Sequence, residues 1–361
     1  IKATFPMQEG ISCFFDIYCG YDGPVSGILT EQTKKGGAQM KKTGKRIVAV
    51  ALCLWLLPID ALAAEYLIPV GQVIGLELLS STVSVAAFDE NLGDEAKKAG
   101  LKVGDRILDI DGSAVDSAED VRLALERSDG QIRLRILRNS KERQLCIKPR
   151  ITTDGPRLGV YLRQGVTGIG TVTWYDPSSG RFGTLGHGVH DTQGELVDMT
   201  AGRAYPASVL SVVRGKCGQP GQLRGSVDCP QALGTLEKNT KRGVFGSVDS
   251  GWDGKALEVA QHSEIRTGPA TIRSTVCGKE VREYSVEILK IYPEKRQEGR
   301  NMLIRVTDPA LLETTGGIVQ GMSGSPIIQD GKLIGAVTHV LVNDPTTGYG
   351  IFIENMLDAA A

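Results

Sequence analysis

The sequence predicts a mainly β protein, in which a small mixed domain is followed by a larger domain of β-strands. The first observation is a succession of short strand-like runs, separated by Gly, Pro, Asn and Asp, that extends from residue 170 to Ile353 with few helical patterns. The second is a content of 45 glycines and 41% hydrophobic residues, which is typical of a globular, turn-rich chain. The third is a strand, turn and helix pattern confined to residues 66–150.

Composition excludes some classes of function. The net charge of −1 and the aromatic content of 5% give no sign of a nucleic-acid surface. The seven cysteines lack the paired C-x-x-C spacing of a zinc site, so we expect neither a metal nor another cofactor. Cys217 and Cys229 would be able to form a disulfide if their loop is exported, but free thiols are the favoured state.

The N-terminal region has the pattern of a targeting segment. Residues 1–39 show no sustained apolar period, and we interpret them as an upstream extension of a chain that begins naturally at Met40. Residues 40–64 contain four cations and then an uninterrupted apolar run, Ile47–Leu57, which is shorter than the roughly 20 residues of a spanning helix. This pattern predicts an export signal or membrane anchor, with a small-residue cleavage site at Ala61–Ala63. The remainder is then expected across the cytoplasmic membrane.

Residues 66–150 are predicted to form the small domain. Val73–Leu78 is typical of a strand, and Gly100–Gly112 predicts a turn, a strand and a tight Asp-Gly turn. Ser117 is placed to cap a helix that runs to Ser128. Apolar residues then alternate with arginines over 132–137, as in a half-buried strand.

Two segments of this small domain, "AGLKVGDRILDIDG" and "GQVIGLEL", resemble a PDZ domain of the bacterial type. The resemblance implies binding by strand addition, in which an extended peptide pairs with a sheet edge and loop N–H groups hold its terminal carboxylate. It further implies that four residues of the predicted strand line the peptide site, namely Val73, Ile74, Gly75 and Leu76.

Residues 151–361 are predicted to form the larger domain, a β-sandwich or β-barrel entered through a linker. Near its end, Gly321–Pro326 places Ser323 between glycines, a pattern that presents a nucleophilic hydroxyl on a tight turn. Two strand-like runs follow, at 331–339 and 348–353. A Gly/Ser turn in a simple hairpin is the alternative.

A serine nucleophile needs a base, and the chain has four histidines. His187 follows an apolar strand and lies between two glycines, which gives an imidazole a rigid base and open space. His190 lies beside an aspartate in a turn-like segment, and His262 has polar neighbours. His339 lies on the strand-like run after Ser323 and is the main competitor, but His187 is favoured as the base.

The carboxylate that would orient the histidine is left open by the residues alone. Asp308 ends an alternating strand shortly before the serine, where a turn-capping role before proline is the alternative. Asp191 and Asp198 are nearer to His187 in sequence, which gives no information on their distance in space.

Taken together, "GTLGHGVHD", the long block from "VTDPALLETTGGIVQGMSGSPIIQDG" to "YGIFIE", and the preceding PDZ-like domain resemble the SpoIVB peptidase family of endospore-forming bacteria over residues 40–357. This resemblance implies a serine endopeptidase with a chymotrypsin-like double β-barrel. It also implies a location in the space between mother cell and forespore. Members cleave themselves and then a membrane protein that restrains an intramembrane metalloprotease, which releases a late mother-cell sigma factor.

The resemblance also implies roles for individual residues. His187 would be the base, Asp308 its orienting carboxylate and Ser323 the nucleophile, with the N–H groups of Gly321 and Ser323 as the oxyanion hole. Two residues of the following strand are expected to line the substrate cleft: Thr338 and His339.

Two other functions were weighed. A non-catalytic adaptor would use the PDZ-like domain to bind a membrane partner, but the complete His, Asp and Ser set argues against it. A general envelope quality-control protease would place the PDZ domain after the protease, whereas here it comes first.

Overall fold

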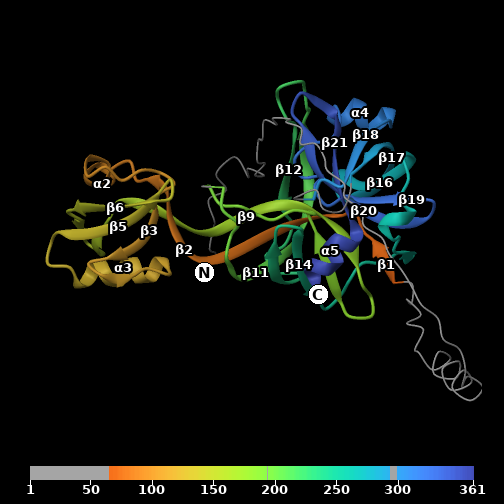
Figure 1. Ribbon diagram of the computed structural model, residues 1–361. Coiled ribbons are helices and arrows are strands. Elements are labelled where there is room, and N and C mark those ends of the chain that lie inside the picture. The colour runs from red at the N-terminus through yellow and green to blue at the C-terminus, as the bar shows by residue number, and fades with distance from the viewer. Residues whose placement is uncertain (1–64, 193, 293–298) are drawn as a thin grey trace, which may run out of the picture. The chain divides into compact units, whose positions relative to one another are not determined.

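The structure is a computed structural model that describes residues 65–192, 194–292 and 299–361 (Figure 1). The extension expected at 1–39 and the export or anchor segment expected at 40–64 lie outside the described residues. Within the described ranges, no helix is both long and apolar enough to cross a membrane.

Six antiparallel strands close the first of two β-barrels. In order around the ring they are β2 (Val73–Phe88), β9 (Val160–Tyr175), β10 (Arg181–Thr184), β14 (Gly243–Val248), β13 (Gly234–Thr240) and β11 (Met199–Val213). The ring closes because β2 pairs with both β11 and β9. Three shorter strands extend it: β1 (Tyr66–Pro69), β12 (Gln222–Val227) and β15 (Leu257–Glu258). Its interior holds fully buried apolar side chains such as Ile74, Val172 and Phe182.

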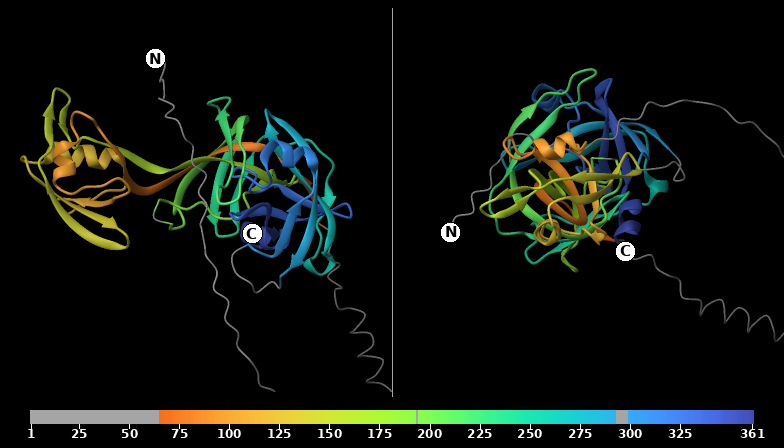
Figure 2. Two further views of the ribbon diagram at one scale, coloured as in Figure 1. Left: turned by 90° about the horizontal axis from the view of Figure 1, so that it is seen from above. Right: turned by 90° about the vertical axis from the view of Figure 1, so that its left-hand side faces the viewer.

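A second closed barrel follows in the chain (Figures 1 and 2). Its strands, in ring order, are β16 (Gly268–Cys277), β17 (Glu280–Ile291), β18 (Met302–Val306), β21 (Asp344–Phe352), β20 (Lys332–Leu341) and β19 (Pro326–Gln329). Three helices accompany these strands: the short 3-10 helix η1 (His262–Glu264), α4 (Pro309–Thr315) and α5 (Ile353–Ala360). The mainly β fold class with a double barrel is therefore confirmed.

A smaller unit is formed by the chain between Val83 and Leu162. It comprises the second half of β2, the start of β9, and α2 (Asp94–Lys98), β3 (Arg106–Ile110), β4 (Ser113–Ala114), α3 (Ala118–Arg127), β5 (Ile132–Arg138), β6 (Lys141–Ile147), β7 (Arg150–Thr152) and β8 (Gly155–Arg157). The strands pair in the order β6, β5, β3, β2, β9. They enclose a separate apolar core.

Local expectations for this unit are confirmed. Ser117 is the N-cap of α3 and accepts a hydrogen bond from the Asp120 N–H at 3.1 Å. Along β5, buried and exposed residues alternate from Ile132 to Ile136. Asp111 and Gly112 both have positive φ, 53° and 85°, as a tight Asp-Gly hairpin turn requires.

The N-terminal boundary expected for this unit is wrong. We expected the small domain to occupy 66–150, but β1 and the first half of β2 are strands of the first barrel, since β1 pairs with β9 and Val73–Leu78 pairs with β9 and β11. The smaller unit is therefore inserted into the first barrel between β2 and β9. Strand β2 runs through both parts without a break, and its continuous apolar pattern gives no sign of the boundary.

The peptide site expected at Val73, Ile74, Gly75 and Leu76 is also wrong. Strand addition needs an open sheet edge, but these residues have a strand on each side: Val73–Leu76 pairs with β9, and Ile74–Leu76 also pairs with β11. The side chains of Val73, Ile74 and Leu76 are 4% exposed or less. This segment is a wall of the barrel and offers no edge to a peptide.

Candidate active site

Ser323 lies on a turn that directly precedes β19 and is shaped by two glycines. Gly321 and Gly324 have φ values of 98° and 94°, a region that L-residues rarely adopt. At Gly324, a Cβ atom would lie 2.0 Å from the carbonyl oxygen of Thr171, so no side chain fits there. The glycines flanking the serine thus let the turn approach β9 closely, while Ser323 itself remains 5% exposed.

Strand β9 holds this turn through two threonines. The Thr171 N–H donates to the Ser323 carbonyl at 3.1 Å, and the Thr171 hydroxyl donates to the Gly321 carbonyl at 2.8 Å. The Thr173 hydroxyl donates to the Gly324 carbonyl at 2.7 Å. Three carbonyls of the turn are therefore fixed by one strand.

The same Thr171 holds the turn that carries His187. Its carbonyl accepts hydrogen bonds from the Thr184 hydroxyl at 2.6 Å and from the Leu185 N–H at 3.3 Å. Leu185 and Gly186 both have a φ of 70°, which turns the chain sharply after β10. A Cβ at Gly186 would lie 2.9 Å from the Thr338 methyl group, so this turn packs directly on β20.

The structure brings His187, Ser323, Thr338 and His339 together. The Ser323 hydroxyl donates to the Thr338 carbonyl at 2.8 Å. The His187 and His339 ring centroids lie 5.2 Å apart. The expected nucleophile, the expected base and the two expected cleft residues thus converge at the C-terminal part of β20 in the second barrel.

The protonation of His187 follows from its hydrogen bond. Nδ1 lies 2.9 Å from the carbonyl oxygen of Gly188. Because a carbonyl oxygen only accepts, Nδ1 must carry the hydrogen, and Nε2 of the neutral ring then carries the lone pair. This is the tautomer that a general base needs to take a proton from a serine.

The amides expected to form the oxyanion hole are available. In residues 65–192, 194–292 and 299–361, neither the Gly321 N–H nor the Ser323 N–H donates to a protein acceptor, although the Met322 N–H between them bonds to the Val319 carbonyl at 3.1 Å. Two free N–H groups on either side of a bonded one, next to the Ser323 hydroxyl, suit a developing oxyanion.

The structure does not bring Asp308 to this group. Its carboxylate accepts hydrogen bonds from the Leu311 N–H at 3.0 Å and the Ser285 N–H at 3.4 Å, and it forms the N-cap of α4. Leu303 on β18 is level with His339, since both pair with Tyr349. Strands rise about 3.3 Å per residue, so Asp308, five residues after Leu303, lies on the order of 15 Å from the level of His339 along the direction of β18.

The remaining candidates lie in surface segments. His190 forms an isolated bridge with Leu196, and the Asp191 carboxylate accepts the Glu195 N–H at 3.0 Å. His262 contacts the Glu354 carboxylate through Nδ1 at 2.9 Å. Asp198 lines a separate cavity that does not include Ser323 or His187.

A different groove has the features of a peptide site in the smaller unit. A cavity of about 450 Å³ lies between α3 and the segment Thr152–Leu162. Here Val160–Gln164 pairs with β2 on one side, and in the described ranges no strand covers its other side. Just before it, Gly159 has a φ of 70°, and the described chain accepts no hydrogen bond from the Leu158 or Gly159 N–H.

Sequence reasoning missed both this groove and the threonines of β9. Gly155–Gly159 has the composition of a linker, although the alternation of Leu158, Val160 and Leu162 was a visible strand signal. Thr171 and Thr173 had no signal, because their hydroxyls act on residues far away in sequence.

Comparisons with known proteins agree with this geometry. A family model for SpoIVB peptidase S55 matches residues 154–357, and a PDZ domain model matches residues 96–138. The chain belongs to the SpoIVB peptidase family. It is accordingly a serine endopeptidase, and its inserted unit is a PDZ domain whose helix α3 lines the groove.

Individual relatives are more distant from this SpoIVB-family peptidase. A putative zinc metalloprotease, R01501, of Rhizobium meliloti (strain 1021) is 30% identical over 136 residues, a match that spans 37% of this chain and 34% of that relative. The Rv3671c protease of M. tuberculosis is similar in its inactive form at 15% identity, 54% of this chain, 84% of that chain and a TM-score of 0.33. Its active form is 16% identical, and the match covers 66% of this chain and 82% of that chain with a TM-score of 0.32.

In the described part of the SpoIVB-family chain, no group of three or more His, Cys, Asp or Glu is arranged to hold a metal ion. The four cysteines in the same part are free thiols: Cys146, Cys217, Cys229 and Cys277.

The environment of His339 yields a testable pH dependence. Burial, followed by the nearby charges of His187 and Arg300, lowers the pKa of His339 from 6.5 to about 3. Below about pH 6.5 the unfolded chain binds a proton at His339, whereas the folded chain binds it only below about pH 3. The free energy of unfolding therefore decreases as the pH falls from about 6.5 to about 3. Linkage gives a loss of about 2 kcal/mol between pH 7.5 and pH 5.

We predict that His339→Gln reduces this acid-induced loss of stability. The measurement is denaturant unfolding of the parent and the variant at pH 7.5 and pH 5. The same loss in both proteins would contradict the assignment of His339 as a buried neutral imidazole.

Proposed function

We propose that the chain is an exported sporulation signalling peptidase that cleaves itself and then a membrane protein that restrains an intramembrane metalloprotease, so that a late mother-cell sigma factor is released. At the level of the family it is a SpoIVB-type serine peptidase of sporulation. The proposed location is the space between mother cell and forespore, reached through the segment 40–64. The observation that carries the proposal is the convergence of Ser323, His187 and two free backbone N–H groups at one point.

The proposed mechanism starts from the resting state described above. The Ser323 hydroxyl rotates from the Thr338 carbonyl towards Nε2 of His187, which accepts its proton as Oγ attacks the scissile carbonyl. The N–H groups of Gly321 and Ser323 stabilise the oxyanion, and His187 returns the proton to the leaving amine as the C–N bond breaks. A water molecule, deprotonated by His187, then hydrolyses the acyl-enzyme, and the proton returns to the Ser323 oxygen. The strand segment at Thr338 and His339 lines the cleft and pairs with the substrate backbone.

The role of Asp308 is better supported as a positioning role than as a direct one. The tautomer of His187 is set here by the Gly188 carbonyl, while the Asp308 carboxylate caps α4. Helix α4 leads directly into the Gly316 turn and then to Gly321, so a firm cap would support the catalytic turn. The catalytic role implied by the family resemblance requires this carboxylate to leave its cap.

For the PDZ domain we propose a partner peptide that binds in extended form with an apolar C-terminal end. The open edge at Val160–Gln164 supplies main-chain pairing. The apolar side chains of Val121 and Leu125 from α3 and of Leu158 line the groove. The free N–H groups of Leu158 and Gly159 suit a terminal carboxylate.

The first prediction tests the nucleophile. We expect purified full-length chain to produce self-cleavage fragments and to be labelled by a peptide phosphonate. Ser323→Ala should show neither, with a loss of about 10⁴-fold or more in cleavage rate. The matched control is Ser325→Ala, which alters a neighbouring hydroxyl that is bonded to the Met322 carbonyl and should retain the label.

An unlabelled but folded parent would contradict the peptidase proposal and favour the adaptor function. Label retained in Ser323→Ala would contradict Ser323 as the nucleophile.

The second prediction separates the two roles of Asp308. Asparagine caps helices about as well as aspartate. We therefore expect Asp308→Asn to keep stability within about 0.5 kcal/mol and kcat/KM within about tenfold, whereas Asp308→Ala should lose about 1 kcal/mol of stability. Denaturant unfolding and peptide cleavage assays measure both. A loss of about 10⁴-fold in kcat for a stable Asp308→Asn would instead show that the carboxylate acts on His187.

The third prediction tests the groove. A fluorescent peptide with alternating apolar residues and a free C-terminal carboxylate should bind the full chain, and its amidated analogue should bind more weakly. Ala118→Trp fills the groove from an exposed position of α3 and should abolish binding. Arg127→Trp adds the same bulk at another exposed position of α3 that does not line the groove, and it should not abolish binding. Equal binding by both variants would place the peptide site elsewhere.

A further inference from the structure

One strand connects the PDZ groove with the catalytic turns. The first residues of β9, Val160–Leu162, line the groove beside α3. Further along the same strand, Thr171 bonds to both the Ser323 turn and the His187 turn. The peptide-binding edge and the support of the catalytic residues are therefore parts of one continuous β-strand (Figure 1).

The two parts of β9 are joined at an irregular point. The pairing of β9 with β2 shifts in register between Leu78, opposite Val166, and Val83, opposite Gln164. Gly165 lies at the shift with a φ of 96°, and a Cβ there would lie 2.0 Å from the Leu78 carbonyl oxygen. Such a bulge bends and twists a strand locally.

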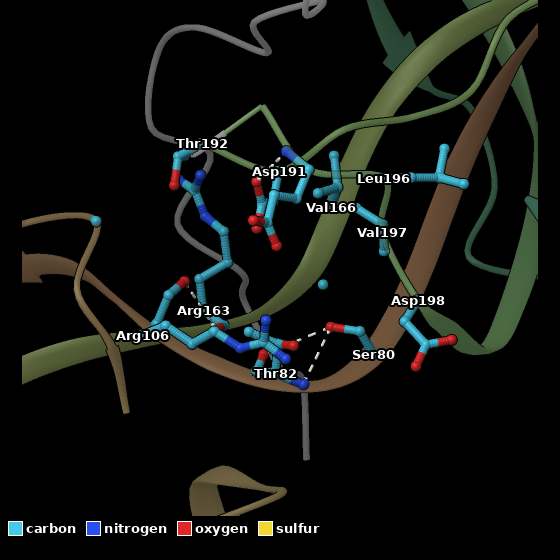
Figure 3. A pocket seen from close by; sticks show the side chains of 14 residues that line it. Ser80, Thr82, Arg106, Arg163, Val166, Asp191, Thr192, Leu196, Val197 and Asp198 are labelled. Atoms are coloured by element: carbon cyan, nitrogen blue, oxygen red, sulfur yellow. Dashed lines mark hydrogen bonds between the residues drawn. The ribbon is translucent and has the colours of Figure 1, made fainter. Parts of the chain in front are cut away.

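A cavity of about 270 Å³ lies beside this bulge (Figure 3). Ser80 and Thr82 of β2 bond to each other on its wall, at 3.2 Å from the Thr82 N–H to the Ser80 hydroxyl. Arg163 and Val166 of β9 line it on either side of Gly165. The strand therefore has space around the point at which its two parts meet.

The groove half of β9 is less restrained than the catalytic half. Val160–Gln164 pairs with a strand on one side. By contrast, Thr171 pairs with Val73, the Thr173 carbonyl accepts the Val70 N–H, and both threonine hydroxyls bond to the serine turn. An added peptide strand would supply main-chain hydrogen bonds to the free side and restrict the motion of this half. A change in the twist or position of Val160–Gln164 would then reach Thr171 through the short segment of β9 that connects them.

We propose that a peptide bound in the PDZ groove activates the peptidase through β9, by fixing Thr171 and with it both catalytic turns. This inference rests on the proposed nucleophile and the proposed groove. It adds that binding of a peptide in the groove is thermodynamically coupled to the catalytically competent arrangement of Ser323 and His187. In the structure the Ser323 hydroxyl bonds to the Thr338 carbonyl, and a bound peptide would favour the arrangement in which Ser323 faces His187.

Coupling of this kind is reciprocal for binding. If the groove peptide lowers the Kd of a ligand that binds the competent active site, then that ligand must lower the Kd of the groove peptide by the same factor. The readout is therefore a dissociation constant and does not depend on turnover alone.

The experiment uses the full chain, the fluorescent groove peptide and a reversible peptide boronate that adds to the serine. We expect saturating groove peptide to raise kcat/KM about fivefold or more. We also expect saturating boronate to lower the Kd of the groove peptide by the same factor by which saturating peptide lowers the Kd of the boronate. Fluorescence anisotropy with and without boronate measures the second quantity.

A decoupling variant tests the route. Insertion of Gly-Gly between Gln164 and Gly165 enters the bulge, where β2 residues 79–82 have no partner on β9 and the neighbouring cavity provides space. Peptide binding and basal cleavage should persist, and both coupling effects should disappear. Ala118→Trp should lose peptide binding and, with it, the stimulation by the peptide.

Each contrary outcome has a distinct meaning. Bound peptide without any change in kcat/KM or in the boronate-dependent Kd overturns the coupling alone. Stimulation that persists in the Gly-Gly variant overturns the route through β9. No peptide binding to the parent overturns the groove assignment and the coupling with it, and a boronate that fails to bind overturns Ser323 as the nucleophile.

Discussion

Thr171 makes the contacts on which the candidate active site depends. Its N–H and hydroxyl bond to the turn of Ser323, and its carbonyl accepts from the residues that turn the chain towards His187. These bonds span 2.6–3.3 Å and are buried, so each is shielded from competing water. Because nucleophile and base come from different barrels, one residue that bonds to both turns fixes their relative position, which serine catalysis requires.

The close approach of these turns also explains the glycines. Gly324 meets the Thr171 carbonyl and Gly186 meets the methyl group of Thr338, so in both places a side chain would push a catalytic turn out of position. The insertion of the PDZ domain between β2 and β9 places this same wall of the barrel in direct covalent continuity with a peptide groove.

The orientation of His187 is set in part by the backbone. The Gly188 carbonyl selects the tautomer that carries the hydrogen on Nδ1 and the lone pair on Nε2. A carbonyl dipole stabilises an imidazolium less than a carboxylate does. His339, kept neutral by burial, adds no second positive charge beside His187. Asp308 contributes through the α4 cap, and its position beyond the end of β18 explains the difference from the family expectation.

The sequence by itself determined the β-rich class, the capped helix at Ser117 and the Asp-Gly turn, and it predicted Ser323 and His187 as nucleophile and base. These features depend on local chemistry: a glycine turn, a cap or an apolar period is visible within a few residues. Only the tertiary structure decided that Val73–Leu76 is an inner wall of a barrel and that the peptide edge lies at Val160–Gln164. An apolar run has the same sequence pattern whether the strand it forms is paired on both sides or has an open edge. The strands that pair with it come from distant parts of the chain, so the pattern alone does not distinguish the two arrangements.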